Sequence, residues 1–138
     1  MSGVYGILRS TLETCHKGEV VLAGRFRPNG ASTPTVWYGN WISSIAHTAT
    51  GVWTVTIKPA FRGMVGHHAA QLSLMSNALV ATAIQFGAID WSAGTIIIRG
   101  YTTTSGAAAD IASNANTWID LLFVMKYMKI PDGDLLVT

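Results

Sequence analysis

The segment Val52-Trp53-Thr54-Val55-Thr56-Ile57-Lys58 alternates strictly between apolar and polar residues. Successive side chains of a β-strand point to opposite faces, so the apolar residues share one face and the polar residues share the other. The segment is also rich in β-branched and aromatic residues, which favour strands. We therefore predict a strand here, with Trp53 pointing into a core.

Most of the chain carries similar short patterns, and stripes with a helical period are rare. Further strands are predicted over Val20–Arg27, Thr35–Tyr38, Trp41–His47, Ala69–Met75, Val80–Ile89, Thr95–Tyr101 and Trp118–Met128. About seven or eight short strands without a βαβ rhythm predict an all-β fold, an antiparallel sandwich or barrel.

Turn residues lie between these segments. Thr48-Ala49-Thr50-Gly51 predicts a hairpin before the strand at Val52. Pro28-Asn29-Gly30 predicts a turn, because proline fixes φ while asparagine and glycine accept positive φ. Trp91-Ser92-Ala93-Gly94 predicts another turn, and Thr102–Asn116 is predicted to be mostly loop.

The last predicted strand is apolar on both faces. Alternation places Ile119, Leu121, Phe123, Met125 and Tyr127 on one face, and Trp118, Asp120, Leu122, Val124 and Lys126 on the other. A helix over Ala107–Met128 is the alternative, but Asn114, Asn116 and Thr117 interrupt it. Two apolar faces mean that both are covered, one by the core and the other by a neighbouring subunit or partner.

Composition supports a surface shared with other chains. The chain has 138 residues, which fits a single domain over 1–138, and only 12% of them are charged, against about 25% in ordinary globular domains. Hydrophobic residues make up 49%, yet no apolar run approaches the roughly 20 residues of a membrane-spanning helix. We therefore expect no membrane partner, and because the basic residues are scattered, we expect no nucleic-acid binding either.

Residues for catalysis or metal binding form no convincing set. His67 and His68 would point to opposite faces of a strand, and Asp132 and Asp134 lack the other oxygen ligands of a calcium loop. The single cysteine, Cys15, excludes a multi-cysteine metal site. Nucleophile-elbow and phosphate-binding glycine motifs are absent. We therefore predict a protein that is not an enzyme and carries no cofactor or metal.

Aromatic residues and the two ends are the candidates for binding. Trp37, Tyr38 and Trp41 surround a predicted turn, and an interface is favoured over a ligand site because no charged groups accompany them. The poorly patterned arm Met1–Lys17 and the tail 130–138 are expected to be extended segments that can lie on a neighbour. The candidate interface residues are Tyr5, Leu8, Leu12, Trp37, Tyr38, Trp41, Trp118, Leu135, Leu136 and Val137.

Several motifs occur in an order that resembles small virion proteins of tailed bacteriophages. They are Phe26-Arg27-Pro28-Asn29-Gly30, Trp41-Ile42-Ser43-Ser44-Ile45, Thr50-Gly51-Val52-Trp53-Thr54-Val55-Thr56, Ala93-Gly94-Thr95-Ile96-Ile97-Ile98-Arg99 and Ala109-Asp110-Ile111-Ala112-Ser113-Asn114-Ala115-Asn116. The resemblance covers roughly residues 20–128, and the family is that of capsid cement or decoration proteins.

This resemblance implies a jelly-roll-like β-sandwich that is made in the host cytoplasm and binds the outside of the phage head. Its partners would be the major capsid protein and further copies of itself, as a dimer or a trimer. It implies no catalytic residue. The alternative is a receptor- or carbohydrate-binding β-sandwich of a tail fibre or spike, which would share the fold and the aromatic residues.

Overall fold

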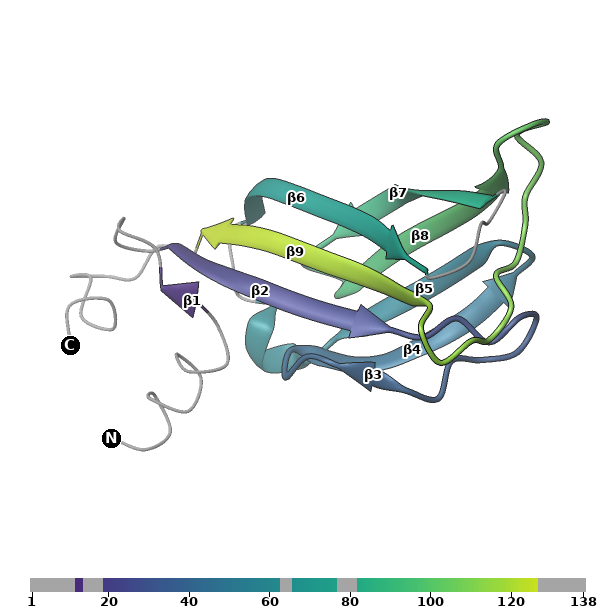
Figure 1. Ribbon diagram of the computed structural model, residues 1–138. Helices are drawn as coiled ribbons and strands as arrows, with labels where there is room; N and C mark the ends of the chain where they lie inside the picture. Colours follow the sequence, from purple (N-terminus) through teal and green to yellow (C-terminus); the bar gives the residue numbers. More distant parts are fainter. Residues whose placement is uncertain (1–11, 14–18, 63–65, 77–81, 127–138) are drawn as a thin grey trace, which may run out of the picture.

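The computed structural model describes residues 12–13, 19–62, 66–76 and 82–126. Within these residues the chain forms two antiparallel sheets that pack face to face (Figure 1). The predicted antiparallel β-sandwich is thereby confirmed.

The first sheet brings together strands from both halves of the sequence. Its order is β1 (Leu12–Glu13), β2 (Glu19–Phe26), β9 (Trp118–Lys126) and β6 (Gly66–Met75), and β3 (Trp37–Tyr38) pairs with the same edge of β2 as β1. β9 therefore lies between β2 and β6, although these three strands are not consecutive in the sequence. In the described part of this sheet, only the short strands β1 and β3 pair with a strand that is adjacent to them in the sequence. Side-chain clusters on this sheet must consequently combine distant parts of the sequence.

The second sheet is built from two hairpins side by side. Its order is β4 (Ile42–Ala49), β5 (Val52–Ile57), β8 (Thr95–Thr102) and β7 (Thr82–Asp90). The 3-10 turn η1 (Pro59–Phe61) follows β5, and Phe61 is buried. A long loop after β8 then leads back to β9 in the first sheet.

The predicted strands are all present, with shifted ends. β6 includes Gly66, before the predicted start at Ala69, and β7 spans Thr82–Asp90, while the predicted start at Val80 lies outside the described residues. The helix considered for Ala107–Met128 is wrong, because Trp118–Lys126 is a strand. β1 was not predicted; its two residues are held by pairing with β2 rather than by a pattern of their own.

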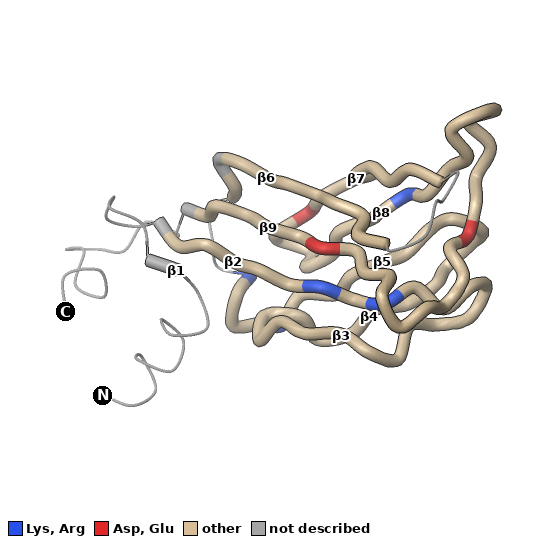
Figure 2. Tube along the Cα trace, in the orientation of Figure 1, with Lys and Arg blue, Asp and Glu red and all other residues tan. Residues whose placement is uncertain are grey.

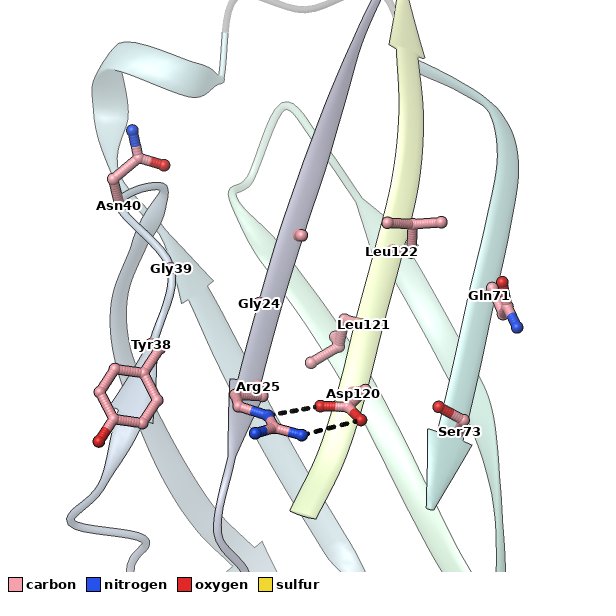
Figure 3. A pocket seen from close by; sticks show the side chains of 11 residues that line it. Gly24, Arg25, Tyr38, Gly39, Asn40, Gln71, Ser73, Asp120, Leu121 and Leu122 are labelled. Carbon is pink, nitrogen blue, oxygen red and sulfur yellow. Dashed lines mark hydrogen bonds and ion pairs between the residues drawn. The ribbon is translucent and has the colours of Figure 1, made fainter. Parts of the chain in front are cut away.

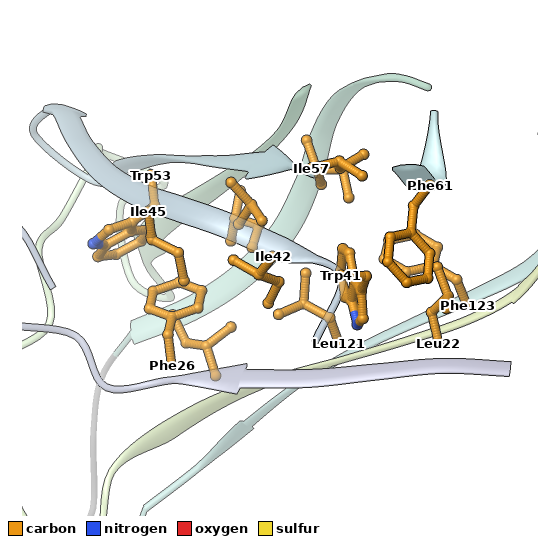
Figure 4. Close-up of a cluster of buried hydrophobic side chains, with 14 of the residues drawn as sticks. Leu22, Phe26, Trp41, Ile42, Ile45, Trp53, Ile57, Phe61, Leu121 and Phe123 are labelled. Atoms are coloured by element: carbon orange, nitrogen blue, oxygen red, sulfur yellow. The ribbon is translucent and has the colours of Figure 1, made fainter. Parts of the chain in front are cut away.

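The core lies between the two sheets and is lined by alternate residues of the long strands (Figure 4). Trp53, Val55 and Ile57 are each 0% exposed, as the period-two pattern predicts. On β9 the buried side chains are Ile119, Leu121, Phe123 and Met125. Their outward neighbours Trp118, Asp120, Leu122 and Val124 are half-buried. The predicted core face of β9 is thus confirmed, and its other face is the outer surface of the first sheet.

Asp110 fastens the long loop to the β4–β5 hairpin. Its Oδ1 accepts a hydrogen bond from the Gly51 backbone N–H at 2.6 Å and lies 2.7 Å from His47 Nε2. Gly51 has a φ of 65°, so this turn uses the left-handed conformation that glycine adopts without steric cost. Burial raises the pKa of Asp110, but the hydrogen bonds from Gly51 and His47 outweigh it and hold the pKa below its usual value.

Candidate functional site

Trp41 was predicted at an interface, and this prediction is wrong. Its side chain is 0% exposed, and its ring packs 5.9 Å from Phe123 in an edge-on arrangement and 6.5 Å from Trp91. Its Nε1 donates a hydrogen bond to the Ala23 carbonyl oxygen at 2.8 Å. Trp41 lies in the turn before β4, where the alternation of a strand does not apply.

The space for this indole depends on Gly24. A Cβ at position 24 would lie 3.0 Å from Cζ2 of Trp41 and 2.8 Å from Cδ1 of Ile42. The absence of a side chain on this inward position of β2 lets the tryptophan pass beneath the strand. The aromatic ring of Trp41 is therefore part of the core, and of the three aromatic residues around this turn only Trp37 and Tyr38 remain interface candidates.

Tyr38 and Trp118 are brought together on the outer surface of the first sheet. Their ring centroids are 5.7 Å apart with a tilt of 44°, and Tyr38 is 60% exposed. Trp37, in contrast, is half-buried and packs against the core. The sequence prediction thus identified two members of a real surface cluster, although it could not pair them.

Two arginines complete this cluster, and the sequence analysis missed both. The guanidinium carbons of Arg25 and Arg27 each lie 4.6 Å from the centroid of the Trp118 ring. Cation–π contacts of this kind are worth about 0.5–1 kcal/mol at exposed sites. Arg25 is an outward residue of β2 and Arg27 follows directly after the strand, but only the pairing of β2 with β9 brings this end of β2 beside Trp118.

Arg25 also forms a two-point ion pair with Asp120 on the neighbouring strand. Arg25 Nε donates to Asp120 Oδ1 at 2.8 Å, and the second contact, from Nη2 to Oδ2, is 3.3 Å (Figure 3). Along the Cα trace, a basic position on β2 lies beside an acidic position on β9 (Figure 2). The hydrogen bond to Asp120 raises the pKa of Arg25, so the guanidinium stays charged. Exposed ion pairs contribute only about 0–1 kcal/mol to stability, so the main effect of this pair is to orient both side chains.

A shallow hollow of about 550 Å³ lies beside this ion pair (Figure 3). Tyr38 and Asn40 lie on its β3 side, and Gln71 and Ser73 line it from β6. The floor is formed by Ala23, Gly24, Leu121 and Leu122. The hollow thus combines one aromatic rim residue with several hydrogen-bonding groups.

The remaining candidates lie at the ends of the chain. Leu12 is in β1, where it pairs with Val21. Tyr5, Leu8, Leu135, Leu136 and Val137 lie outside the described residues, as do Cys15, Asp132 and Asp134. The predicted arm and tail contacts therefore stay predictions.

His67 lies at an end of the sandwich rather than in a polar site. The Trp91 indole donates a hydrogen bond to His67 Nδ1 at 3.0 Å, and the His67 ring lies 5.6 Å from Phe123. In the part of the chain that the structure describes, no three residues among His, Cys, Asp and Glu gather closely enough to hold a metal ion. Over the same residues, no helix is long and apolar enough to cross a membrane.

Comparison of the chain with protein-family models, curated proteins and solved structures finds no match. The function is therefore argued from the surface of the sandwich and from the ordered motifs.

Proposed function

We propose that this chain is a capsid cement protein of a tailed phage. In this role it binds the outside of the head as a dimer or trimer and bridges subunits of the major capsid protein. The ordered motifs between residues 20 and 128 support the proposal, and the β-sandwich is the fold that the resemblance implies.

The observation that carries the proposal is an apolar row on the outside of the first sheet. Val21 on β2, Val124 on β9 and Ala69 on β6 lie side by side in register, and Ala23 pairs with Leu122 in the next row. Outward positions of a sandwich are ordinarily polar. Contiguous apolar surface on a soluble protein marks an interaction site.

A binder of this kind stabilises the shell by mass action. A protein that binds only the assembled capsid lowers its free energy by RT ln(1 + [L]/Kd) at each site. Self-association adds avidity, because one oligomer can hold several capsid subunits at once. The low charge of the chain fits this role, since the cores of protein interfaces are depleted of charged residues.

The proposal is tested with expanded heads that lack this protein. Heads incubated with the full chain should break at a higher temperature than bare heads, and Val124→Lys should abolish the gain because it places a charge in the apolar row. Thr54→Lys is the matched control, because Thr54 is half-buried on the outer face of the other sheet. Circular dichroism verifies that both variants fold.

Equal breaking temperatures with and without the wild-type chain would overturn the proposal. So would a location at the tail tip rather than over the head in images of intact virions, which would favour the receptor-binding alternative. A native mass measurement then distinguishes a dimer from a trimer.

A further inference from the structure

The hollow beside the Arg25–Asp120 pair adjoins the apolar row of Val21, Val124 and Ala69 and takes Ala23 and Leu122 from the next row, but its polar lining gives it a chemistry of its own. Its volume of about 550 Å³ falls within the roughly 300–1,000 Å³ of small-molecule sites. It lies on the first sheet, where residues of β2, β9 and β6 line it (Figure 3). Its lining differs from that of a protein interface, because polar side chains enter it from three strands.

The charges of the hollow cancel. Arg25 and Asp120 are the charged residues among those that line it, and they are bound to each other through two contacts. A phosphate or carboxylate ligand would need a cation that is not already neutralised. Arg27 does not supply one at the hollow, because it is not among the residues that line it. The lining therefore favours a neutral ligand.

The hydrogen-bonding groups suit a ligand with many hydroxyls. The Gln71 amide both donates and accepts, the Ser73 hydroxyl does the same, and the paired carboxylate and guanidinium offer an acceptor next to a donor. Gln71 and Ser73 are both exposed and stand two positions apart on one face of β6. A polar rim spaced along a strand matches a ring that presents hydroxyls at regular intervals.

Tyr38 supplies the apolar contact. With 60% of its surface exposed, its ring combines an apolar face with a hydrogen-bonding hydroxyl. Trp118 supports it from one side and also contacts the Arg25 guanidinium, so Trp118 positions both Tyr38 and Arg25. This support keeps a largely exposed ring in a defined place.

We propose that the hollow binds a neutral oligosaccharide, with the C–H face of one sugar ring on Tyr38 and the hydroxyls of the rings that follow on the Arg25–Asp120 pair, Ser73 and Gln71. More than one ring is needed because β2 and β9 lie between β3 and β6, and neighbouring strands are about 4.8 Å apart. This site does not depend on the proposed role in the capsid. A bound sugar would use the polar end of the sheet face, whereas the capsid contact would use the apolar row at Val21 and Val124.

The test is saturation-transfer NMR on the full chain with defined sugars. The panel contains the neutral methyl glycosides of glucose, mannose, galactose and N-acetylglucosamine, the neutral polysaccharides dextran and mannan, and the anionic sugars sialic acid and glucose 6-phosphate. We expect transfer to the ring C–H protons of at least one neutral sugar. A polysaccharide that binds when its monosaccharide does not would identify a chain, rather than a free sugar, as the ligand.

Variants locate the binding. Tyr38→Ala and Gln71→Ala should each weaken it roughly tenfold, whereas Tyr38→Phe should retain it within about twofold because the ring remains. Gln85→Ala is the matched control, since Gln85 is an exposed glutamine on β7 of the other sheet. The Val124→Lys variant should bind sugar like the wild-type chain.

Three results would overturn the inference. They are no transfer to any neutral sugar, transfer only to the anionic sugars, and neutral-sugar binding that Tyr38→Ala and Gln71→Ala leave unchanged. None of these results bears on the breaking temperature of the heads, so failure of this site and failure of the capsid role are distinguishable.

Discussion

The indole Nε1 of Trp41 donates a hydrogen bond to the carbonyl oxygen of Ala23 at 2.8 Å. The contact falls on the edge of β2 between the two short strands, β1 at Val20–Val21 and β3 at Arg25–Phe26. The buried indole of Trp41 thus donates a hydrogen bond to a backbone carbonyl of β2 at a position that pairs with neither β1 nor β3.

Trp41→Phe tests this contact. The variant leaves the Ala23 carbonyl oxygen without its donor and removes part of a wholly buried ring, so we expect the free energy of unfolding to fall by about 2–4 kcal/mol. Urea unfolding followed by circular dichroism measures the change. Trp37→Phe, at a half-buried position, should cost less, and equal losses would contradict the assigned role of Trp41.

Trp53→Phe should be milder than Trp41→Phe although both indoles are 0% exposed. Among the described residues, Trp53 Nε1 is buried without a hydrogen-bond partner. Replacing it removes an unsatisfied donor, which offsets part of the lost packing, and we expect a cost of about 1–2 kcal/mol. The same urea experiment ranks the two variants, and a larger loss for Trp53→Phe would be the contrary result.

Gly51→Ala should be strongly destabilising. A Cβ there would lie 2.5 Å from the Gly100 carbonyl oxygen and 2.7 Å from the Ala109 backbone nitrogen, and the φ of 65° is itself unfavourable for alanine. We expect a loss of about 3 kcal/mol or more. Gly106→Ala is the control, because Gly106 has a φ of 72° but no atom within 4 Å of the added Cβ. Thermal unfolding should show a much smaller shift for the control, and similar shifts would mean that the backbone contact does not matter.

Stability should fall in acid through Asp110. The folded pKa of Asp110 lies below its unfolded value, so its contribution is complete above the unfolded pKa of about 3.9 and is lost as pH falls through the folded pKa. Asp110→Asn should therefore flatten the decline in unfolding free energy below about pH 4. Urea titrations at several pH values measure the slope.

Asp90 provides the comparison for this titration. Hydrogen bonds from the Ala93 backbone N–H and the Ser92 hydroxyl also lower the pKa of Asp90, but Asp90 is exposed at the end of β7. Asp90→Asn should change the acid slope less than Asp110→Asn does. An unchanged slope in Asp110→Asn would show that the loop anchor does not titrate in this range.

Local patterns were sufficient to predict every described strand except β1, and the direction of most side chains. The alternation over Val52–Ile57 and over Trp118–Met125 predicted which residues are buried, because the period of a strand depends only on neighbouring residues. The turns at Gly51 and Gly94, both with positive φ, were predicted for the same reason. Alternation did not predict the burial of Trp41, because Trp41 lies in a turn, where side-chain direction depends on the path of the backbone.

The surface cluster was decided by the tertiary structure. Arg25 and Asp120 are 95 residues apart in sequence, and they meet because β9 pairs with β2 in one particular register. A shift by one residue would send every side chain of β9 to the opposite face. The sequence by itself determined an all-β chain with alternating strands, since those features follow from local propensity and period. The pairing of distant strands decided which outward residues became neighbours, and with them the ion pair, the hollow and the apolar row.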